Sequence, residues 1–328
     1  MDFLKKYPIF SKLLIMLLLG ILSVIIPLWS IKIIIFLAGV FVFSTIIKRG
    51  AIAFIILVLI FSLPTTLTIK LRPFFLNNFI ENFSQRRLQN YQKNIIYPDT
   101  NTELFTDEVL IDMGNSNLIL EFTDGNNISY SSKLKIEQGK TIKISTNKGN
   151  NYSFYLKIGT ESLKYLKINA NNVKLSGKAT LNELKINATA ISFNSLDIEC
   201  ENLKLNGTGI NIDGKINSKF FEIDGTGINI DGYISGKNFN LNGTGINIDS
   251  KINYEEIRID GTGMNVDIKL GRKNTYTRIN ATTIIGSIDI SNNPAQIKIL
   301  CTSGNIKIKN YKKAVLDIKG PRLTFEQE

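Results

Sequence analysis

The chain has 328 residues, of which 44% are hydrophobic, and its formal net charge is +11. It contains no histidine, which excludes serine–histidine–aspartate catalysis and histidine-ligated zinc or haem. Residues 1–72 carry eight basic and one acidic residue, 73–103 three of each, and 104–328 carry 28 and 24. The positive charge therefore gathers near the N-terminus, and we expect no nucleic acid among the partners.

Three apolar runs near the N-terminus have the length at which an α-helix crosses the hydrocarbon of a bilayer. They cover residues 13–29, 31–47 and 51–69, and charged residues occur only at their edges. We expect residues 1–72 to form a transmembrane region with three spans, whose partner is the lipid bilayer. A cleaved signal peptide is the alternative for the first run, but no small-residue cleavage site follows it.

An odd number of spans places the two ends of the chain on opposite sides of a membrane. The positive-inside rule favours a cytoplasmic N-terminus by five basic residues to three, with the C-terminal domain outside the cytoplasmic membrane. Residues 73–103 are expected to form an amphipathic connector, because aromatic and aliphatic residues recur in them at spacings of three to five. These residues are Phe75, Phe79, Phe83, Leu88 and Tyr91.

The rest of the chain, residues 104–328, contains an internal repeat of about 18 residues. The string GTGINID occurs at 207–213, 225–231 and 243–249, and GTGMNVD follows at 261–267. Degenerate copies extend the clear repeats over residues 168–302, with steps of 18 to 20 residues. A fixed period of this length is typical of architectures in which each unit packs on its neighbours.

The aligned copies form columns with strict side-chain requirements. The first column is aliphatic in all eight copies: Ile168, Ile186, Leu205, Ile223, Leu241, Ile259, Ile279 and Ile299. The second column is Asn or Asp in seven copies, the third accepts only Ala, Gly or Cys, and the fourth is Thr in six consecutive copies. Alternating apolar residues such as Ile210 and Ile212 follow each small-residue corner, which is the periodicity of a strand.

These columns predict an all-β domain, a single-stranded parallel β-helix or β-solenoid, with coils of about 18 residues. One coil buries about five apolar side chains, each of which contributes roughly 1.5–3 kcal/mol. This burial cannot offset the conformational entropy lost when 18 residues are ordered, so several coils must stack. Cys200 and Cys301 lie about five coils apart, too far for a disulfide, and are expected to be small buried residues. Residues 315–318 are expected to form a last strand, and Gly320-Pro321 to end the pairing.

The Gly-Ile-Asn motif at 209–211, 227–229 and 245–247, with the run 302–308, resembles the bacterial putative adhesin families of unknown function, which include the head-GIN group. This resemblance implies a β-solenoid over roughly residues 110–320, usually right-handed, although an 18-residue period equally suits a left-handed hexapeptide coil. Apolar helices followed by such a solenoid also look like the LiaF-like regulators of envelope stress, which tend to have four spans.

The leading hypothesis is a membrane-anchored, envelope-facing binding or scaffolding protein of the putative adhesin type, in the bacterial cytoplasmic membrane. Its partner would be an envelope polymer or a membrane protein. A LiaF-like regulator acting through the spans and a bactofilin-like structural polymer are the alternatives. A β-helix lyase would need one coil with a non-repeating cluster of acidic and basic residues, and the sequence holds none. We therefore predict no enzyme activity, no cofactor, and no catalytic, cofactor-binding or metal-binding residues.

One acidic column leaves two interpretations open. Asp213, Asp231, Asp249 and Asp267 each follow an inward Ile or Val, so we expect them in a file on the outer surface. Lys215, Lys251 and Lys269 lie two residues after three of them. A solvated, charge-balanced face is the simpler interpretation. Calcium shared between adjacent carboxylates is the alternative.

Overall fold

The computed structural model describes residues 95–146, 152–290, 295–310 and 314–327. The chain divides into two units, Met1–Arg72 and Pro73–Glu328, and every described residue belongs to the second. The three expected spans and most of the expected connector lie outside the described residues. Among the residues that are described, no helix is long and apolar enough to cross a bilayer.

All regular structure in the described residues is β-strand, which confirms the all-β expectation for this part of the chain. The strands are β1 (Ile95–Ile96), β2 (Thr100–Glu103), β3 (Glu108–Asp112), β4 (Asn117–Thr123), β5 (Asn127–Tyr130), β6 (Lys135–Glu137), β7 (Ile142–Ser145), β8 (Ser153–Gly159), β9 (Tyr165–Ser176), β10 (Lys178–Leu270), β11 (Tyr276–Ile290), β12 (Gln296–Lys309), β13 (Val315–Lys319) and β14 (Arg322–Gln327). The sheet begins earlier than the expected boundary at residue 104, because β1 pairs with β8 and β2 pairs with β5.

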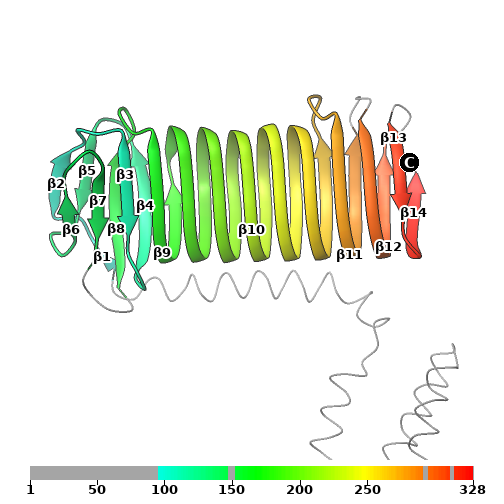
Figure 1. Ribbon diagram of the computed structural model, residues 1–328, viewed down its shortest axis with the longest axis horizontal. Coiled ribbons are helices and arrows are strands. Elements are labelled where there is room, and N and C mark those ends of the chain that lie inside the picture. The colour runs from blue at the N-terminus through cyan, green and yellow to red at the C-terminus, as the bar shows by residue number, and fades with distance from the viewer. Residues whose placement is uncertain (1–94, 147–151, 291–294, 311–313, 328) are drawn as a thin grey trace, which may run out of the picture. The chain divides into compact units, whose positions relative to one another are not determined.

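Strand β10 runs for 93 residues without interruption. A straight strand of this length would extend for about 300 Å. Instead, β10 winds through successive turns of similar size (Figure 1). Side chains one repeat apart hydrogen-bond within it, as Asn229 does with Asn211, so each turn lies in register with the turn before it. We use the word coil for one such turn.

The strands around β10 continue the same stacking in parallel. Between β9 and β10, Ile168 lies opposite Ile186, and between β10 and β11, Ile259 lies opposite Ile279. Ile279 in turn lies opposite Ile299 of β12. The register between strands is therefore the register of the sequence repeat, and the aliphatic column predicted from the alignment is a column in space.

The core consists of these stacked apolar columns. Ile210, Ile228 and Ile246 are at most 2% exposed, as the alternation of the repeat predicts. Phe221, Phe239 and Tyr254 stack along one side of the core with ring centroids 5.3 and 5.5 Å apart. The stack places each aromatic ring on the ring of the next coil, where offset contact adds to the burial of their surface.

Both cysteines are buried and free, as expected from their isolation in the sequence. Each is 6% exposed. Burial raises the pKa of the Cys200 thiol to about 11 and also raises the pKa of Cys301. Both thiols are therefore protonated near neutral pH and behave as small apolar groups rather than as nucleophiles.

The two ends of the coil stack are built differently. At the N-terminal end, β2 pairs with β5, β5 with β8, and β6 with β7, all antiparallel. At the C-terminal end, β13 and β14 both pair with β12 in parallel, as ordinary coils do. Gly320 and Pro321 were expected to end the pairing, and that expectation is wrong. They form the corner between β13 and β14, where a missing N–H donor costs nothing, and pairing resumes at Arg322.

The small-residue column can be tested with two glycines of the same coil. A Cβ at Gly225 would lie 2.9 Å from the Gly207 carbonyl oxygen and 3.0 Å from Ile228 Cγ1, whereas a Cβ at Gly227 would meet its nearest atom at 3.7 Å. We expect Gly225→Val to destabilise the domain by roughly 1–3 kcal/mol through overpacking, and Gly227→Val to have little effect. Protease resistance of the full chain at increasing temperature measures the difference, and equal unfolding temperatures would contradict it.

Candidate binding face

Four consecutive coils present the same four residue types on one side of the stack. We call this surface the repeat face. It consists of Thr208, Thr226, Thr244 and Thr262; Gly209, Gly227, Gly245 and Gly263; Asn211, Asn229, Asn247 and Asn265; and Asp213, Asp231, Asp249 and Asp267. The threonines and aspartates are exposed and the asparagines are half-buried. Because coils stack about 4.8 Å apart, each residue type forms a straight file along the stack.

The asparagines of the repeat face form a hydrogen-bonded ladder. Asn229 Nδ2 donates to Asn211 Oδ1 at 2.8 Å, and Asn247 donates to Asn229 at 2.7 Å. Asn265 donates to Asn247 at 2.7 Å. Each amide nitrogen carries two hydrogens and uses one of them for its rung. The face therefore retains one outward N–H donor per coil, held in place by its neighbours.

The second column of the repeat shows what happens when aspartate replaces asparagine in such a ladder. Asn187 donates to Asn169 at 2.9 Å and Asn206 donates to Asn187 at 2.8 Å. Asp224 follows and accepts from Asn242 at 3.0 Å. A carboxylate has no hydrogen to donate back to Asn206, so among the described hydrogen bonds this ladder is interrupted there. The repeat face has asparagine in all four coils, so its three hydrogen bonds form a continuous ladder.

The glycine file next to the ladder is a strip of bare main chain. A Cβ at Gly209 would meet nothing within 4 Å, and a Cβ at Gly227 or Gly263 would meet only a main-chain oxygen at 3.7 or 3.8 Å. Side chains would therefore fit here, yet four successive coils have none. A glycine strip of this kind lets another molecule approach the main chain closely, between the exposed threonine hydroxyls and the asparagine ladder.

The aspartate file lies on the outer surface, as the alternation of the repeat predicts. All four carboxylates are exposed. Lys215, Lys251 and Lys269 are exposed as well, and among the described residues none of them forms an ion pair with this file. Their charges are therefore balanced through solvent. Within the described ranges, no three Cys, Asp or Glu residues gather in a group that could hold a metal ion.

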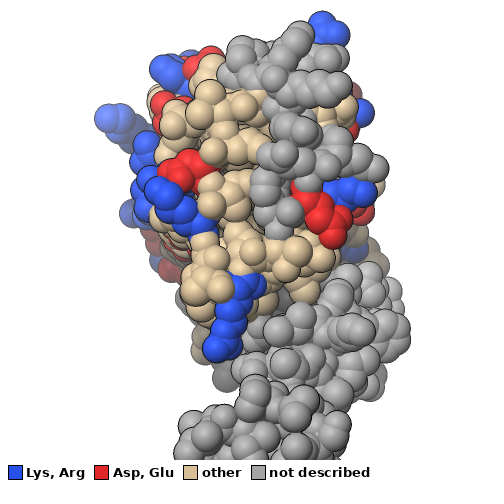
Figure 2. Space-filling model, turned by 90° about the vertical axis from the view of Figure 1, so that its right-hand side faces the viewer, with Lys and Arg blue, Asp and Glu red and all other residues tan. Residues whose placement is uncertain are grey.

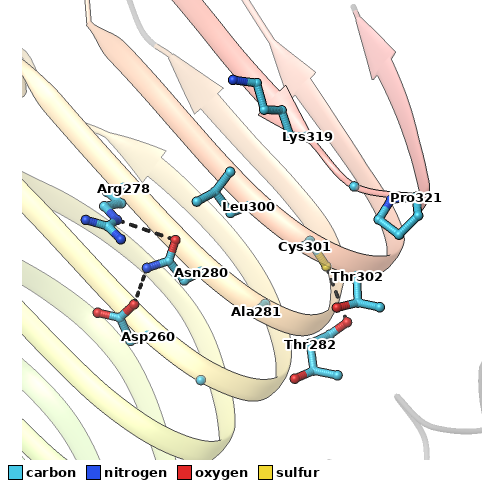
Figure 3. Close-up of a pocket in the computed structure, with 12 residues that line it drawn as sticks. Asp260, Arg278, Asn280, Ala281, Thr282, Leu300, Cys301, Thr302, Lys319 and Pro321 are labelled. Atoms are coloured by element: carbon cyan, nitrogen blue, oxygen red, sulfur yellow. Dashed lines mark hydrogen bonds between the residues drawn. The ribbon is translucent and has the colours of Figure 1, made fainter.

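An open hollow of about 730 Å³ lies nearer the C-terminal end of the stack (Figure 3). Asn280 donates a hydrogen bond to the Asp260 carboxylate and accepts one from Arg278 at 3.4 Å. Leu300, Cys301 and Pro321 form its apolar part, and Lys319 lies at its far side. Its acidic group is tied to an amide, and its thiol donates to the Ser303 carbonyl at 2.9 Å. The hollow can accommodate a polar group, and among the described residues that line it no nucleophile lies beside a base.

Comparison with known proteins finds neither a matching protein family nor a matching curated protein. The solved structures similar to the chain include two putative adhesins. A putative adhesin from Bacteroides fragilis NCTC 9343 is 12% identical with a TM-score of 0.30, over 71% of this chain and 100% of that one. A putative adhesin from Parabacteroides merdae ATCC 43184 is 15% identical with a TM-score of 0.32, over 72% and 98%. Both descriptions name the family that the Gly-Ile-Asn motif resembles, but similarity of this size carries no function to this chain.

The asparagine ladder predicts different effects for one substitution at two rungs. In Asn229→Asp, the new carboxylate cannot donate to Asn211, so a half-buried oxygen loses its partner at a cost of about 1–3 kcal/mol. In Asn211→Asp, a carboxylate oxygen at position 211 can still accept the hydrogen bond from Asn229 Nδ2, so we expect little change in stability. The measurement is the unfolding temperature of the full chain by protease resistance at pH 7.

The same variant has a defined pH dependence. When the introduced carboxyl group is protonated, its O–H can donate to Asn211 and the rung is restored. The folded state therefore binds this proton more tightly, so the folded-state pKa lies above the unfolded value, and stability is regained as the pH falls through it. An Asn229→Asp protein that loses no more stability than Asn211→Asp, or gains none on acidification relative to it, would show that the ladder contributes little.

Proposed function

We propose that this protein is a membrane-anchored, non-catalytic binding protein of the bacterial cell envelope, in which a β-solenoid presents the repeat face to an extended carbohydrate polymer. The proposal rests on the repetition of the same surface groups in straight files along the repeat face. Four coils offer the same hydroxyl, bare main chain, amide and carboxylate at a spacing of about 4.8 Å.

The parallel register and the winding of β10 support the solenoid. Pairing partners lie 18 to 20 residues apart from β9 to β12, so each coil is built on the previous one. Such a rod has long, flat sides, and a ligand that matches one coil also matches the next if its own groups recur along its length. A polymer lying along the rod axis meets this condition.

The chemistry of the face favours a hydroxyl-rich polymer. A sugar hydroxyl both donates and accepts hydrogen bonds, and the face provides an outward amide N–H and an exposed carboxylate in every coil. The glycine strip allows a flat ring to lie against the main chain. Each contact is weak in water, but several in register on one chain act together.

The proposals that the protein is anchored in the membrane and that its C-terminal domain is exported are supported by the sequence alone. The apolar runs 13–29, 31–47 and 51–69 would hold the domain at the bilayer, and the distribution of basic residues favours an exported domain. The protonated state of the two buried thiols is consistent with a role that does not involve covalent catalysis.

Carbohydrate binding can be tested by co-sedimentation of the detergent-solubilised full chain with purified, insoluble peptidoglycan. Gly227→Arg places a long side chain over the glycine strip at a position where a Cβ has room, so the fold should be retained. Asn240→Arg adds the same charge at an exposed position outside the repeat face. We expect Gly227→Arg to weaken sedimentation at least tenfold and Asn240→Arg to leave it unchanged. Equal binding by both variants, or no binding by the unmodified chain, would contradict this choice of ligand.

The side of the membrane can be tested with a thiol reagent that does not cross bilayers. Lys237 is exposed, whereas Cys200 and Cys301 are only 6% exposed. Lys237→Cys therefore introduces one accessible thiol into a chain whose own thiols are shielded from the reagent. In intact cells or spheroplasts, we expect the reagent to label this variant and not the unmodified chain. Labelling only after lysis would place the domain in the cytoplasm.

A further inference from the structure

Strands with one unpaired edge occur at both ends of the coil stack among the described residues, but the two ends differ in geometry. At the N-terminal end, antiparallel pairs depart from coil geometry, and the short strand β6 carries Lys135 and Glu137 with exposed side chains. Charged side chains on a short edge strand oppose pairing with an arbitrary strand, so a strand that pairs with β14, where Arg322 and Glu326 are exposed, has to match their charges. At the C-terminal end, β14 pairs with β12 on one side, and no other described strand pairs with it.

This end also exposes apolar side chains of the last coil. Val315 is 66% exposed. Leu316, Ile318 and Leu323 pack against the core but are only partly buried. Figure 2 shows this end of the domain, where uncharged residues occupy most of the described surface and charged residues lie mainly at its sides. The core is therefore not closed here by side chains of the described residues.

The charges along β14 are complementary to those of a second β14 that runs in the opposite direction. From Arg322 to Glu326, the strand begins with a cation, has Thr324 at its centre and ends with an anion. Arg322, Thr324 and Glu326 are all exposed. In an antiparallel pair, residues directly opposite each other share one side of the sheet. If two copies of β14 pair about a two-fold axis at Thr324, each Arg322 therefore lies opposite the Glu326 of the other copy.

We propose that β14 is a self-association edge, which pairs antiparallel with β14 of a second copy of this chain about a two-fold axis at Thr324. The main-chain groups on the open edge of β14 gain partners, and two Arg–Glu pairs form across the axis. Within one chain, Lys307 of β12 lies opposite Glu326 in register. In the proposed dimer, the Glu326 carboxylate lies between Lys307 of its own chain and Arg322 of the second copy.

The proposed contact makes a closed dimer. A two-fold, isologous contact uses the same patch of both copies, so neither copy has a free β14 edge with which to bind a third chain. Continued head-to-tail stacking would need the N-terminal end to accept a parallel coil, but its antiparallel pairs do not offer that geometry. The inference is independent of the ligand of the repeat face, and pairing would place two repeat faces in one assembly.

A disulfide at the axis tests the register. In Thr324→Cys, the two introduced thiols lie directly opposite each other, with Cα atoms about 4.5–5.5 Å apart, which is within disulfide reach. In the matched control Arg322→Cys, the two thiols are about 14 Å apart along the strands and cannot bond. The probe is the full chain in detergent under mild oxidation, analysed on a non-reducing gel. We expect a cross-linked dimer with Thr324→Cys, and monomer with Arg322→Cys and with the unmodified chain, whose cysteines are buried.

Charge reversal tests the partner. Arg322→Glu or Glu326→Arg turns both attractive pairs into repulsive ones, and we expect each to weaken dimerisation of the full chain about tenfold. The double variant Arg322→Glu/Glu326→Arg restores both pairs across the axis, but its basic residue at position 326 faces Lys307 of its own chain. We therefore expect it to recover part of the lost dimerisation, above the level of either single variant. Light scattering of the detergent complexes gives the stoichiometry.

Three results would overturn the proposal. The first is a monomeric unmodified chain at concentrations where Thr324→Cys also fails to cross-link. The second is equal cross-linking at positions 322 and 324, which would indicate random collision. The third is the growth of long filaments in electron micrographs, which would show that the contact does not close. Separately, a double charge variant that dimerises no better than Arg322→Glu and Glu326→Arg would reject the Arg–Glu pairing.

Discussion

Main-chain pairing between consecutive coils is the constraint on which the rest of the structure depends. Because the pairing is parallel and steps by one repeat, each paired residue lies directly over its counterpart in the coil before it. A requirement on one residue then becomes a requirement on a whole column. The aliphatic column is buried in the core, and the small-residue column leaves no room for larger side chains, since a Cβ added at Gly225 would lie 2.9 Å from the Gly207 carbonyl oxygen.

The same constraint decides which polar residues can occupy a column. Asparagine over asparagine satisfies both partners, because each amide donates to one neighbour and accepts from the other. Aspartate over aspartate satisfies neither and must face water, as the exposed file from Asp213 to Asp267 does. In the second column of the repeat, the half-buried Asp224 is followed by Asn242, which donates a hydrogen bond to its carboxylate. The identity of a polar column thus indicates its depth.

Much of the fold could be predicted from the sequence because columns are visible as a period. The inward positions of Ile210 and Ile228 and the burial of both cysteines follow from alternation and spacing. The rungs between asparagines were missed, since alternation predicts that Asn229 points away from the core but does not predict its partner. The 18-residue recurrence of one amide was the available signal. Of the ends, the strand expected at residues 315–318 is confirmed as β13, whereas the pairing of β5 and β14 was not predicted, because both lie where the repeat fades.

The repeat face combines these constraints into a surface on which a ligand has to match only one coil. Contacts made by one threonine, one amide and one carboxylate in water are worth little individually, since each replaces hydrogen bonds to solvent. Four coils hold these groups rigidly at one spacing, so a periodic ligand that is bound at one coil meets the next at high effective concentration. The rigidity comes from the core and the asparagine ladder rather than from the ligand. Selectivity of such a face would then depend on the spacing of the ligand's groups more than on the strength of any one contact.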